Sequence, residues 1–324
     1  PYIQEITFKF FDSEADTIAA LNRRDVDGIG FLSAQNLDRV KAAGRSVTVH
    51  ELEMPRYFTI FANQTQSKIL ADRAVREALM RAIDRNTLVQ DVLRGSAEAT
   101  WGPIPPGLPG AGANPNRYPY TPDEARALLE AAGWKDPDGD GIREKPMGAT
   151  ATSTPLALTM AVPDNDELRL VAEEVRRTWR EVGALLTVQV LPSATLQQDI
   201  IRPRKYDLVL FGEILGAEPD PFSFWHSSQK KNPGLNLALY DNRAAARLLE
   251  EARQTLDPAA RRAKYEEFSK LVIEDIPAFF LYAPTYLYPV SSRVKGVAAT
   301  FATVPAQRFT HIEEWYINTK RVRK

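Results

Sequence analysis

The sequence predicts an α/β fold in which strands and helices alternate along a mixed, largely parallel sheet. In the middle of the chain, short apolar runs of strand length alternate with longer segments of helical periodicity. With 324 residues, the chain is long enough for two domains. Its apolar share of 44% and charged share of 26% are those of an ordinary soluble globular protein.

The first 63 residues predict several strands and one helix. Apolar and polar residues alternate in 3–11, as they do in a half-buried strand. Asp12 or Ser13 can cap a helix whose apolar positions include Ile18 and Leu21. Further strands are expected within 25–32, at 46–52 and at 56–63.

From residue 72 the spacing of apolar residues becomes helical. Val75, Leu79 and Ile83 lie on one helical face, and a second helix is expected to begin at Asp84 and end at Gly95. Residues 101–120 then carry Pro and Gly so densely that we expect an ordered loop.

The clearest predicted helix follows that loop. Thr121 can cap it, Pro122 suits its first turn, Glu124 completes a capping box and Gly133 stands where it should stop. A later helix has Asp257 as its expected cap. The other predicted elements are a strand at 156–162, a helix at 167–183, a strand at 185–191, a short helix at 193–201, a strand at 206–212, helices at 242–255 and 258–274, an extended stretch at 277–290 and a strand-like segment at 296–317.

Charge and hydropathy exclude some classes of partner. A formal net charge of −1 gives no broad basic surface, so nucleic acid is a poor candidate, and the basic residues 320–324 are interpreted as a frayed tail. No stretch approaches the about 20 apolar residues of a membrane span, and no signal peptide stands at the start. The chain enters a predicted strand at once, which suggests a processed or truncated protein.

Few residues offer catalytic chemistry. Cys is absent, which removes disulfides, thiolate catalysis and cysteine metal sites. The three histidines, His50, His226 and His311, are widely separated, and neither a two-histidine zinc motif nor a G-x-S-x-G nucleophile motif is present. We therefore expect a protein that is not an enzyme, with a hydrolase as the less favoured alternative.

Five blocks of sequence stand in a recognisable order. They are "EITFKFFDSEADTIAALNRRDVDGIG", "DRAVREALMRAIDRNTLVQDVLRGSAEATWGPIPPG", "YPYTPDEARALLEAAGW", "YDLVLFG" with "EPDPFSFW", and "RAAARLLEEARQTLDPAARRAKYEEFSKLVIEDIPAFFLY". Together they cover nearly all of 3–297. In this order they resemble the extracellular solute-binding proteins of family 5, which are the oligopeptide-, dipeptide- and nickel-binding receptors of ABC importers.

The resemblance implies a periplasmic-binding-protein-like (class II) fold with two lobes that close on a ligand. Residues 57–289 would form the C-terminal ligand-binding lobe. Residues 1–56 and 290–324 would form part of the first lobe. About the first two-fifths of the family's pattern would lie before Pro1, so the missing N-terminal segment is an expected partner of this chain.

The implied function is that of the substrate-binding component of an ABC importer. It would capture peptides or a similar small solute in a cleft between lobes and present them to an ABC permease in the membrane. No cofactor is implied. The implied location is periplasmic or extracellular, with or without a lipid anchor. An alternative is a protein-interaction or chaperone module on the same fold, because several pocket positions depart from the family's pattern.

The candidate ligand-binding residues follow the strand at 206–212. The family's G-W-x-x-D pattern reads "GEILGAEPD", with Glu213 where Trp is common and Ala217 near the usual Asp. Glu218 or Asp220 could replace the acid that meets a ligand's α-amino group. Ser193 and Ala194 stand where family members often place Trp, which would leave a roomier or differently shaped pocket. The full candidate set is Gly212, Glu213, Ala217, Glu218, Asp220, Phe222 and Trp225. The competing interpretation is that the acids are solvated turn formers and that the rings at 222, 224 and 225 belong to the core.

One acidic turn and one histidine are weaker candidates for metal binding. Asp136, Asp138 and Asp140 hold the first, third and fifth positions of a calcium-type loop, but Met147 occupies the twelfth, so a plain turn is favoured. His226 could touch a ligand or nickel, although a hydrogen-bonded histidine is the more common case. A further cluster, Arg176, Arg177 and Arg180, is interpreted as a solvated helix face, with contact to the importer as the alternative.

Overall fold

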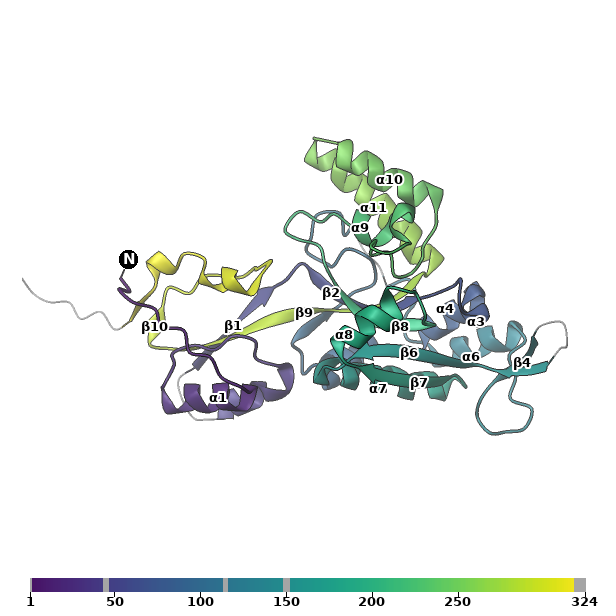
Figure 1. Cartoon of the computed structure of the whole chain (residues 1–324), viewed down its shortest axis with the longest axis horizontal. Helices are drawn as coiled ribbons and strands as arrows, with labels where there is room; N and C mark the ends of the chain where they lie inside the picture. Colours follow the sequence, from purple (N-terminus) through teal and green to yellow (C-terminus); the bar gives the residue numbers. More distant parts are fainter. Residues whose placement is uncertain (1, 43–46, 113–115, 148–151, 318–324) are drawn as a thin grey trace, which may run out of the picture. The chain divides into compact units, whose positions relative to one another are not determined.

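The computed structural model describes residues 2–42, 47–112, 116–147 and 152–317. They form two compact units, which are described separately below (Figure 1). The terminal unit consists of Pro1–Pro55, Leu93–Glu98 and Pro284–Lys324, and the central unit consists of Arg56–Val92 and Ala99–Ala283. Within the described ranges, no helix has both the length and the apolar character needed to cross a membrane.

A mixed sheet forms the middle of the central unit. Its strands are β2 (Arg56–Ala62), β6 (Ala157–Pro163), β7 (Leu185–Leu191), β8 (Leu208–Ile214) and the first part of β9 (Ala278–Ser291), in the order β9-β2-β8-β6-β7. The β6–β7 and β6–β8 pairs are parallel, whereas β2 is antiparallel to both β8 and β9.

The mixed sheet is therefore confirmed, but its description as largely parallel was wrong. Single helices connect β6, β7 and β8, and such crossovers produce parallel neighbours. The connection from β2 to β6 contains several helices and a long loop, so it can return the chain to either end of the sheet. Alternation of elements in the sequence does not reveal that direction.

Most predicted helices of the central unit are present. They are α3 (Lys68–Ala71), α4 (Arg73–Arg81), α5 (Arg85–Thr87) continued by a π-helical turn (Leu88–Val92), α6 (Pro122–Ala131), α7 (Asp166–Glu181), α8 (Ser193–Thr195) continued by a π-helical turn (Leu196–Ile201), α9 (Phe222–Trp225) with a short 3-10 turn (Ser227–Gln229), α10 (Arg243–Gln254) and α11 (Pro258–Asp275). A small hairpin joins β4 (Glu144–Met147) to β5 (Thr152–Pro155).

The predicted caps differ in outcome. Asp257 caps α11 as expected, because its carboxylate accepts the backbone N–H of Ala260 at 2.7 Å. The capping box of α6 is absent, since no backbone N–H reaches the side chain of Thr121. The Thr121 hydroxyl donates instead to the carboxylate of Glu124 at 3.2 Å.

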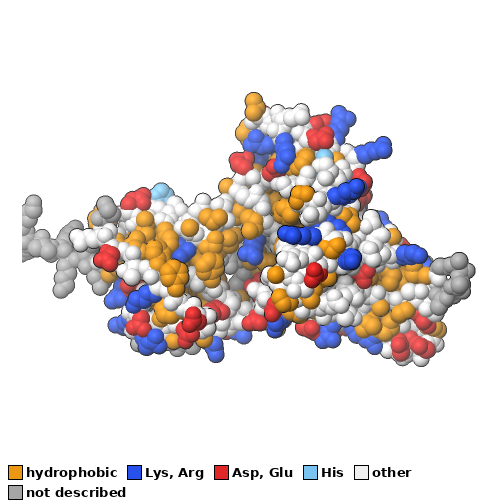
Figure 2. Space-filling view, viewed as in Figure 1, with side chains coloured by type: hydrophobic (Ala, Val, Ile, Leu, Met, Phe, Trp, Pro, Cys, Tyr) orange, Lys and Arg blue, Asp and Glu red, His pale blue; other side chains and the backbone are white. Residues whose placement is uncertain are grey.

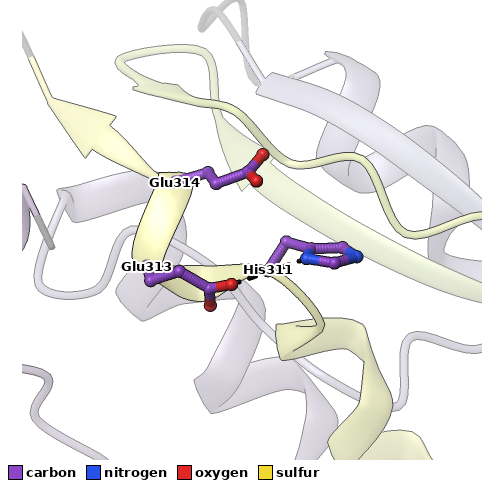
Figure 3. A group of neighbouring side chains, drawn as sticks. All are labelled: His311, Glu313 and Glu314. Carbon is purple, nitrogen blue, oxygen red and sulfur yellow. Dashed lines mark ion pairs between the residues drawn. The ribbon is translucent and has the colours of Figure 1, made fainter.

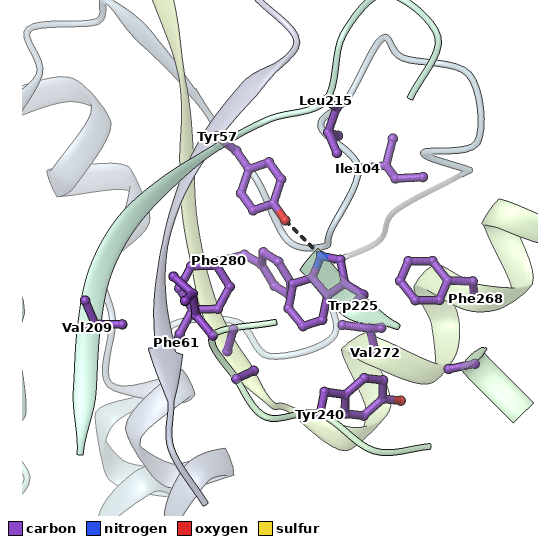
Figure 4. Close-up of a cluster of buried hydrophobic side chains, with 14 of the residues drawn as sticks. Tyr57, Phe61, Ile104, Val209, Leu215, Trp225, Tyr240, Phe268, Val272 and Phe280 are labelled. Atoms are coloured by element: carbon purple, nitrogen blue, oxygen red, sulfur yellow. Dashed lines mark hydrogen bonds between the residues drawn. The ribbon is translucent and has the colours of Figure 1, made fainter. Parts of the chain in front are cut away.

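Helices cover both faces of the central sheet. On one face, the indole N–H of Trp179 in α7 donates to the carbonyl of Leu79 in α4 at 3.0 Å, and its ring lies 5.5 Å from that of Phe279. On the other face, α9, α10 and α11 pack a large apolar cluster that includes Trp225 and Phe268 against the sheet (Figure 4). Burial on both faces explains why β2 and β8 are nearly continuous apolar runs.

The terminal unit is built around the second part of β9. There β9 pairs with β1 (Val47–Glu53) in antiparallel register. Its other elements are α1 (Glu14–Arg23), a 3-10 turn (Ala34–Asn36), α2 (Leu37–Ala42), β3 (Ala97–Ala99), β10 (Val294–Lys295), two 3-10 turns (Pro305–Phe309 and Ile312–Glu314) and β11 (Tyr316–Ile317). Among its described residues, one apolar cluster includes Ile18 and Leu287 and another includes Leu52 and Trp315.

Three strand predictions in this unit were wrong. Residues 3–11 form no strand in the described structure, and 25–32 makes only isolated bridges, from Gly28 to Val290 and from Leu32 to Leu287. Residues 296–317 contain two 3-10 turns, irregular segments and only the two-residue strand β11. Alternating hydrophobicity shows that a segment could lie on a sheet, but a strand also requires a partner backbone, which the pattern does not identify. The basic residues 320–324 lie outside the described ranges.

The register of β2 and β8 generates a prediction about packing. Phe58 stands opposite Gly212, and a Cβ at Gly212 would lie 2.8 Å from the Phe58 ring. We expect Gly212→Ala to lower the free energy of unfolding by about 1–3 kcal/mol through overpacking. Chemical denaturation checks this. The same substitution in a Phe58→Leu background serves as the control and should cost clearly less; equal costs would show that the ring is not the cause.

Candidate functional site

Three strands of the central unit end at one edge of its sheet. The parallel strands β6, β7 and β8 end at Pro163, Leu191 and Ile214. Helix α7 begins just after β6, with the Asn165 side chain accepting the N–H of Leu168 as its cap. In open α/β sheets, ligands bind beyond the carboxyl ends of such strands. We call this region the carboxyl edge and take it as the candidate site.

Antiparallel pairing brings the start of β2 to the carboxyl edge. Arg56 stands opposite Ile214, whose side chain is 57% exposed, and Phe58 stands opposite Gly212. The Phe58 ring occupies the space that a side chain at Gly212 would need. It stacks on Tyr282 at 5.1 Å between ring centroids, and the Arg56 guanidinium lies 4.7 Å from its centroid.

Tyr282 connects this stack to helix α7. Its hydroxyl donates to Oε1 of Glu167 at 2.7 Å, and Glu167 lies in the first turn of the helix. Burial of the ring, together with the nearby Glu167 carboxylate, raises the pKa of Tyr282 well above its usual value. Tyr282 is therefore a neutral, fixed hydrogen-bond donor to Glu167.

A buried acid lies on the opposite face of β8. The Glu213 side chain is 0% exposed and stands across from Tyr57 in the pairing with β2. The indole N–H of Trp225 is shared between Oε2 of Glu213, at 3.3 Å, and the Tyr57 hydroxyl, at 3.2 Å (Figure 4 shows the Tyr57 bond). Oε1 of Glu213 has no hydrogen-bond partner in the described part of the chain. Burial raises the pKa of Glu213 well above its usual value, because removal from water disfavours the carboxylate.

The predicted acids of the following loop are paired with helices. Glu218 is exposed and forms an ion pair with Arg261 of α11 at 2.9 Å. Asp220 forms one with Arg253 of α10 at 2.6 Å. Ala217 is exposed in the same turn. Exposed pairs of this kind contribute little stability, so they order the loop rather than anchor the fold.

The rings after this turn pack in part into the core. Trp225 is 1% exposed and belongs to the apolar cluster, whereas Phe222 is only partly buried against it. Phe222 lies between the guanidinium of Arg253, at 3.7 Å from its centroid, and the parallel ring of His226, at 4.1 Å. The structure thus groups Gly212, Glu213 and Trp225 near the end of β8. Ala217, Glu218 and Asp220 lie in the turn before α9, and Phe222 is the first residue of that helix. Their role in ligand binding stays a prediction.

Four residues of the carboxyl edge were not among the sequence-predicted candidates: Arg56, Phe58, Glu167 and Tyr282. The sequence did carry a signal for Glu167, since the first turn of a helix that follows a parallel strand lies near the carboxyl end of that strand, where ligands of open α/β sheets bind. The other three lie on strands whose direction and register could not be derived from periodicity.

The acidic turn at 136–141 satisfies its carboxylates internally. Asp136 accepts the backbone N–H groups of Gly139 and Gly141, each at 2.9 Å, as expected for a turn. Asp136, Asp138 and Asp140 are close enough to share an ion, and all three are exposed. His226 has partners for both ring nitrogens, Ser228 at 2.7 Å and Glu250 at 3.1 Å.

A second exposed group of possible metal ligands lies in the terminal unit. Figure 3 shows His311, Glu313 and Glu314 around one 3-10 turn. Nδ1 of His311 lies 3.5 Å from Oε1 of Glu313. Exposed groups of this composition are common on protein surfaces without an ion.

The buried acid generates a prediction about pH. The unfolded chain releases the Glu213 proton near pH 4.5, whereas the folded protein retains it to higher pH. Stability contributed by this group is therefore fully present below pH 4.5 and is lost as pH rises toward the folded pKa, at up to about 1.4 kcal/mol per pH unit. We expect Glu213→Gln to remove this decline, so that the stability of the variant relative to wild type increases with pH. Chemical denaturation of both proteins at several pH values measures this difference in stability.

A matched control is available nearby. Glu218→Gln removes an acid whose side chain is 77% exposed, so its stability relative to wild type should change little over the same pH range. Parallel pH profiles for wild type and Glu213→Gln would contradict the assignment of Glu213 as a group that folding protonates.

Comparison with known sequences places the chain in a family. Residues 1–236 match the sequence model described as bacterial extracellular solute-binding proteins, family 5 middle. The oligopeptide-binding protein AppA of Bacillus subtilis is 26% identical over 327 residues, which is 98% of this chain and 56% of that protein. The nickel-binding periplasmic protein of Escherichia coli is 26% identical over 276 residues, 82% of this chain and 51% of that protein.

Solved structures show the same fold. The structure of AppA from Bacillus subtilis in complex with a nonapeptide has a TM-score of 0.77 at 24% identity, over 94% of this chain and 58% of that one. NikA from Brucella suis in complex with Fe(III)-EDTA has a TM-score of 0.80 at 20% identity, over 95% of this chain and 61% of that one. These likenesses confirm the periplasmic-binding-protein-like fold expected from the sequence.

The chain spans about half the length of the curated relatives it matches. The match of the family model over residues 1–236 covers well over half of the chain. The chain therefore belongs to the bacterial extracellular solute-binding proteins of family 5.

Proposed function

We propose that this chain is part of the substrate-binding component of an ABC importer and that it captures peptides or a similar small solute. The match to the family over residues 1–236 carries this proposal. Relatives named for oligopeptides, dipeptides and nickel support a small ligand. We propose an exported location, periplasmic or extracellular, and an ABC permease as the partner. A lipid anchor is not part of the proposal.

The carboxyl edge of the central unit would provide the ligand contacts. An extended ligand could pair with backbone beyond the end of β8, near Gly212 and Ile214, which gives affinity without reading side chains. Flanking side chains would then set the preference. The loop acids at 218 and 220 are already paired with arginines, so they would have to exchange partners to meet a ligand.

The two compact units support the assignment of two lobes. In this proposal the central unit is the ligand-binding lobe and the terminal unit is part of the first lobe. The chain passes between units at Pro55–Arg56, on either side of Leu93–Glu98, and within β9 at Ala283–Pro284. Hinge movement at such crossings, driven by ligand, would produce a closed form that the permease recognises.

An exposed apolar surface supports a larger first lobe. Tyr2, Ile6, Phe8 and Phe10 are exposed along the extended segment 2–11, Phe10 to 95%. A cavity of about 510 Å³ beside this segment is lined by aromatic side chains, including those of Phe309 and Trp315. Figure 2 shows hydrophobic side chains gathered on the terminal unit. Monomeric proteins rarely leave such a patch uncovered, so we propose that further polypeptide, present in the longer relatives, packs on it.

Calorimetry of the protein expressed from its complete reading frame tests the function. We expect saturable binding of peptides of two to nine residues, with the peptides recovered intact by mass spectrometry. The 324-residue chain alone should bind them weakly or not at all, because the first lobe is partial.

Other outcomes would point to the rival functions. Cleaved peptides would favour a hydrolase. Binding of unfolded proteins without binding of short peptides would favour a chaperone module. No binding of any peptide in the set would remove the peptide assignment.

A further inference from the structure

We propose that Glu167, held in place by Tyr282, is the residue that selects ligands carrying an ammonium group. This inference rests on the proposed function and adds a ligand chemistry to it. It is drawn from the arrangement of charges at the carboxyl edge of the central unit, where one carboxylate differs from the others in its partners.

Glu167 is a carboxylate with one oxygen left available. Oε1 accepts the hydroxyl of the buried Tyr282 at 2.7 Å. Within the described residues, Oε2 has no hydrogen-bond partner and Glu167 has no ion pair. The side chain is partly exposed, in the first turn of the 16-residue helix α7. The first turn carries the positive end of the helix dipole, which is a favourable place for an acidic side chain.

The neighbouring acids are occupied in other ways. Asp164 pairs with Arg169, and Asp166 lies 3.9 Å from the same guanidinium. Glu218 and Asp220 are paired with arginines of α11 and α10. Burial raises the pKa of Glu213, which favours its neutral form. Glu167 is thus the acid of this edge whose charge is not matched by a cation in the described part of the chain.

A positively charged side chain, that of Arg56, lies at the other end of the aromatic stack. Arg56 covers Phe58, Phe58 stacks on Tyr282, and Tyr282 holds Glu167, so four side chains form one continuous row. Nε of Arg56 is buried without a hydrogen-bond partner, and no ion pair joins Arg56 to any described acid. A ligand with an ammonium group at Glu167 and a carbonyl or carboxylate toward Arg56 would complement both ends.

The test compares peptides with and without a free amino terminus. The protein expressed from its complete reading frame is titrated with alanine-based peptides of two to nine residues, each also in an N-acetylated form. In wild type we expect the free peptide to bind about 10- to 100-fold more tightly, as for a charge-assisted hydrogen bond. In Glu167→Gln the ratio should fall close to one.

Two further variants separate selection from folding. Asp166→Asn changes the adjacent acid, whose side chain is 95% exposed, and should keep the wild-type ratio. Tyr282→Phe removes only the hydroxyl that orients Glu167, and should lower the ratio while N-acetylated peptides still bind as in wild type. An unchanged melting temperature confirms that Glu167→Gln is folded.

The outcomes are distinguishable from those for the function itself. Equal affinity for free and acetylated peptides in wild type, or an unchanged ratio in Glu167→Gln, overturns this inference and leaves peptide binding in place. Failure of every peptide to bind the wild-type protein overturns the proposed function and the inference together.

Discussion

The pairing of β2 with β8 is the constraint on which the central unit depends. It places Phe58 over the bare backbone of Gly212 on one face of the sheet and Tyr57 opposite Glu213 on the other. A slip of one residue in the pairing would turn side chains to the opposite face of the sheet. It would expose Glu213 to the face covered by α7 and separate Phe58 and Tyr57 from their present neighbours. The same pairing creates the carboxyl edge, because it brings the start of an antiparallel strand to the ends of parallel ones.

Much of the local structure could be predicted from the sequence, because local rules act on neighbouring residues. Strand β7 occupies residues 185–191 as predicted, and Asp257 caps the start of α11 as predicted, by accepting a backbone N–H. Predictions failed where a segment depends on a distant partner. The alternating pattern of 3–11 is suited to a strand, yet no described strand pairs with it. The direction of β2 relative to β8 is another property that no local pattern contains.

The candidate site shows the same division. The sequence indicated the end of the strand at 206–212, and Gly212 and Glu213 do lie at the carboxyl edge. It could not indicate that Tyr282 would reach Glu167, because these residues are 115 positions apart and meet only through the sheet. Nor could it show that Glu213 would be enclosed by Trp225 and Tyr57 rather than presented to solvent. Spatial neighbours of this kind follow from topology, not from composition.

Strand β9 has a consequence for the cooperativity of melting. Its first residues complete the sheet of the central unit through β2, and its last residues pair with β1 in the terminal unit. Fraying of either end exposes backbone amides of one 14-residue strand. The thermal transitions of the two units are thus linked through a shared strand, and amide protons near Pro284 should report on openings that begin in either unit.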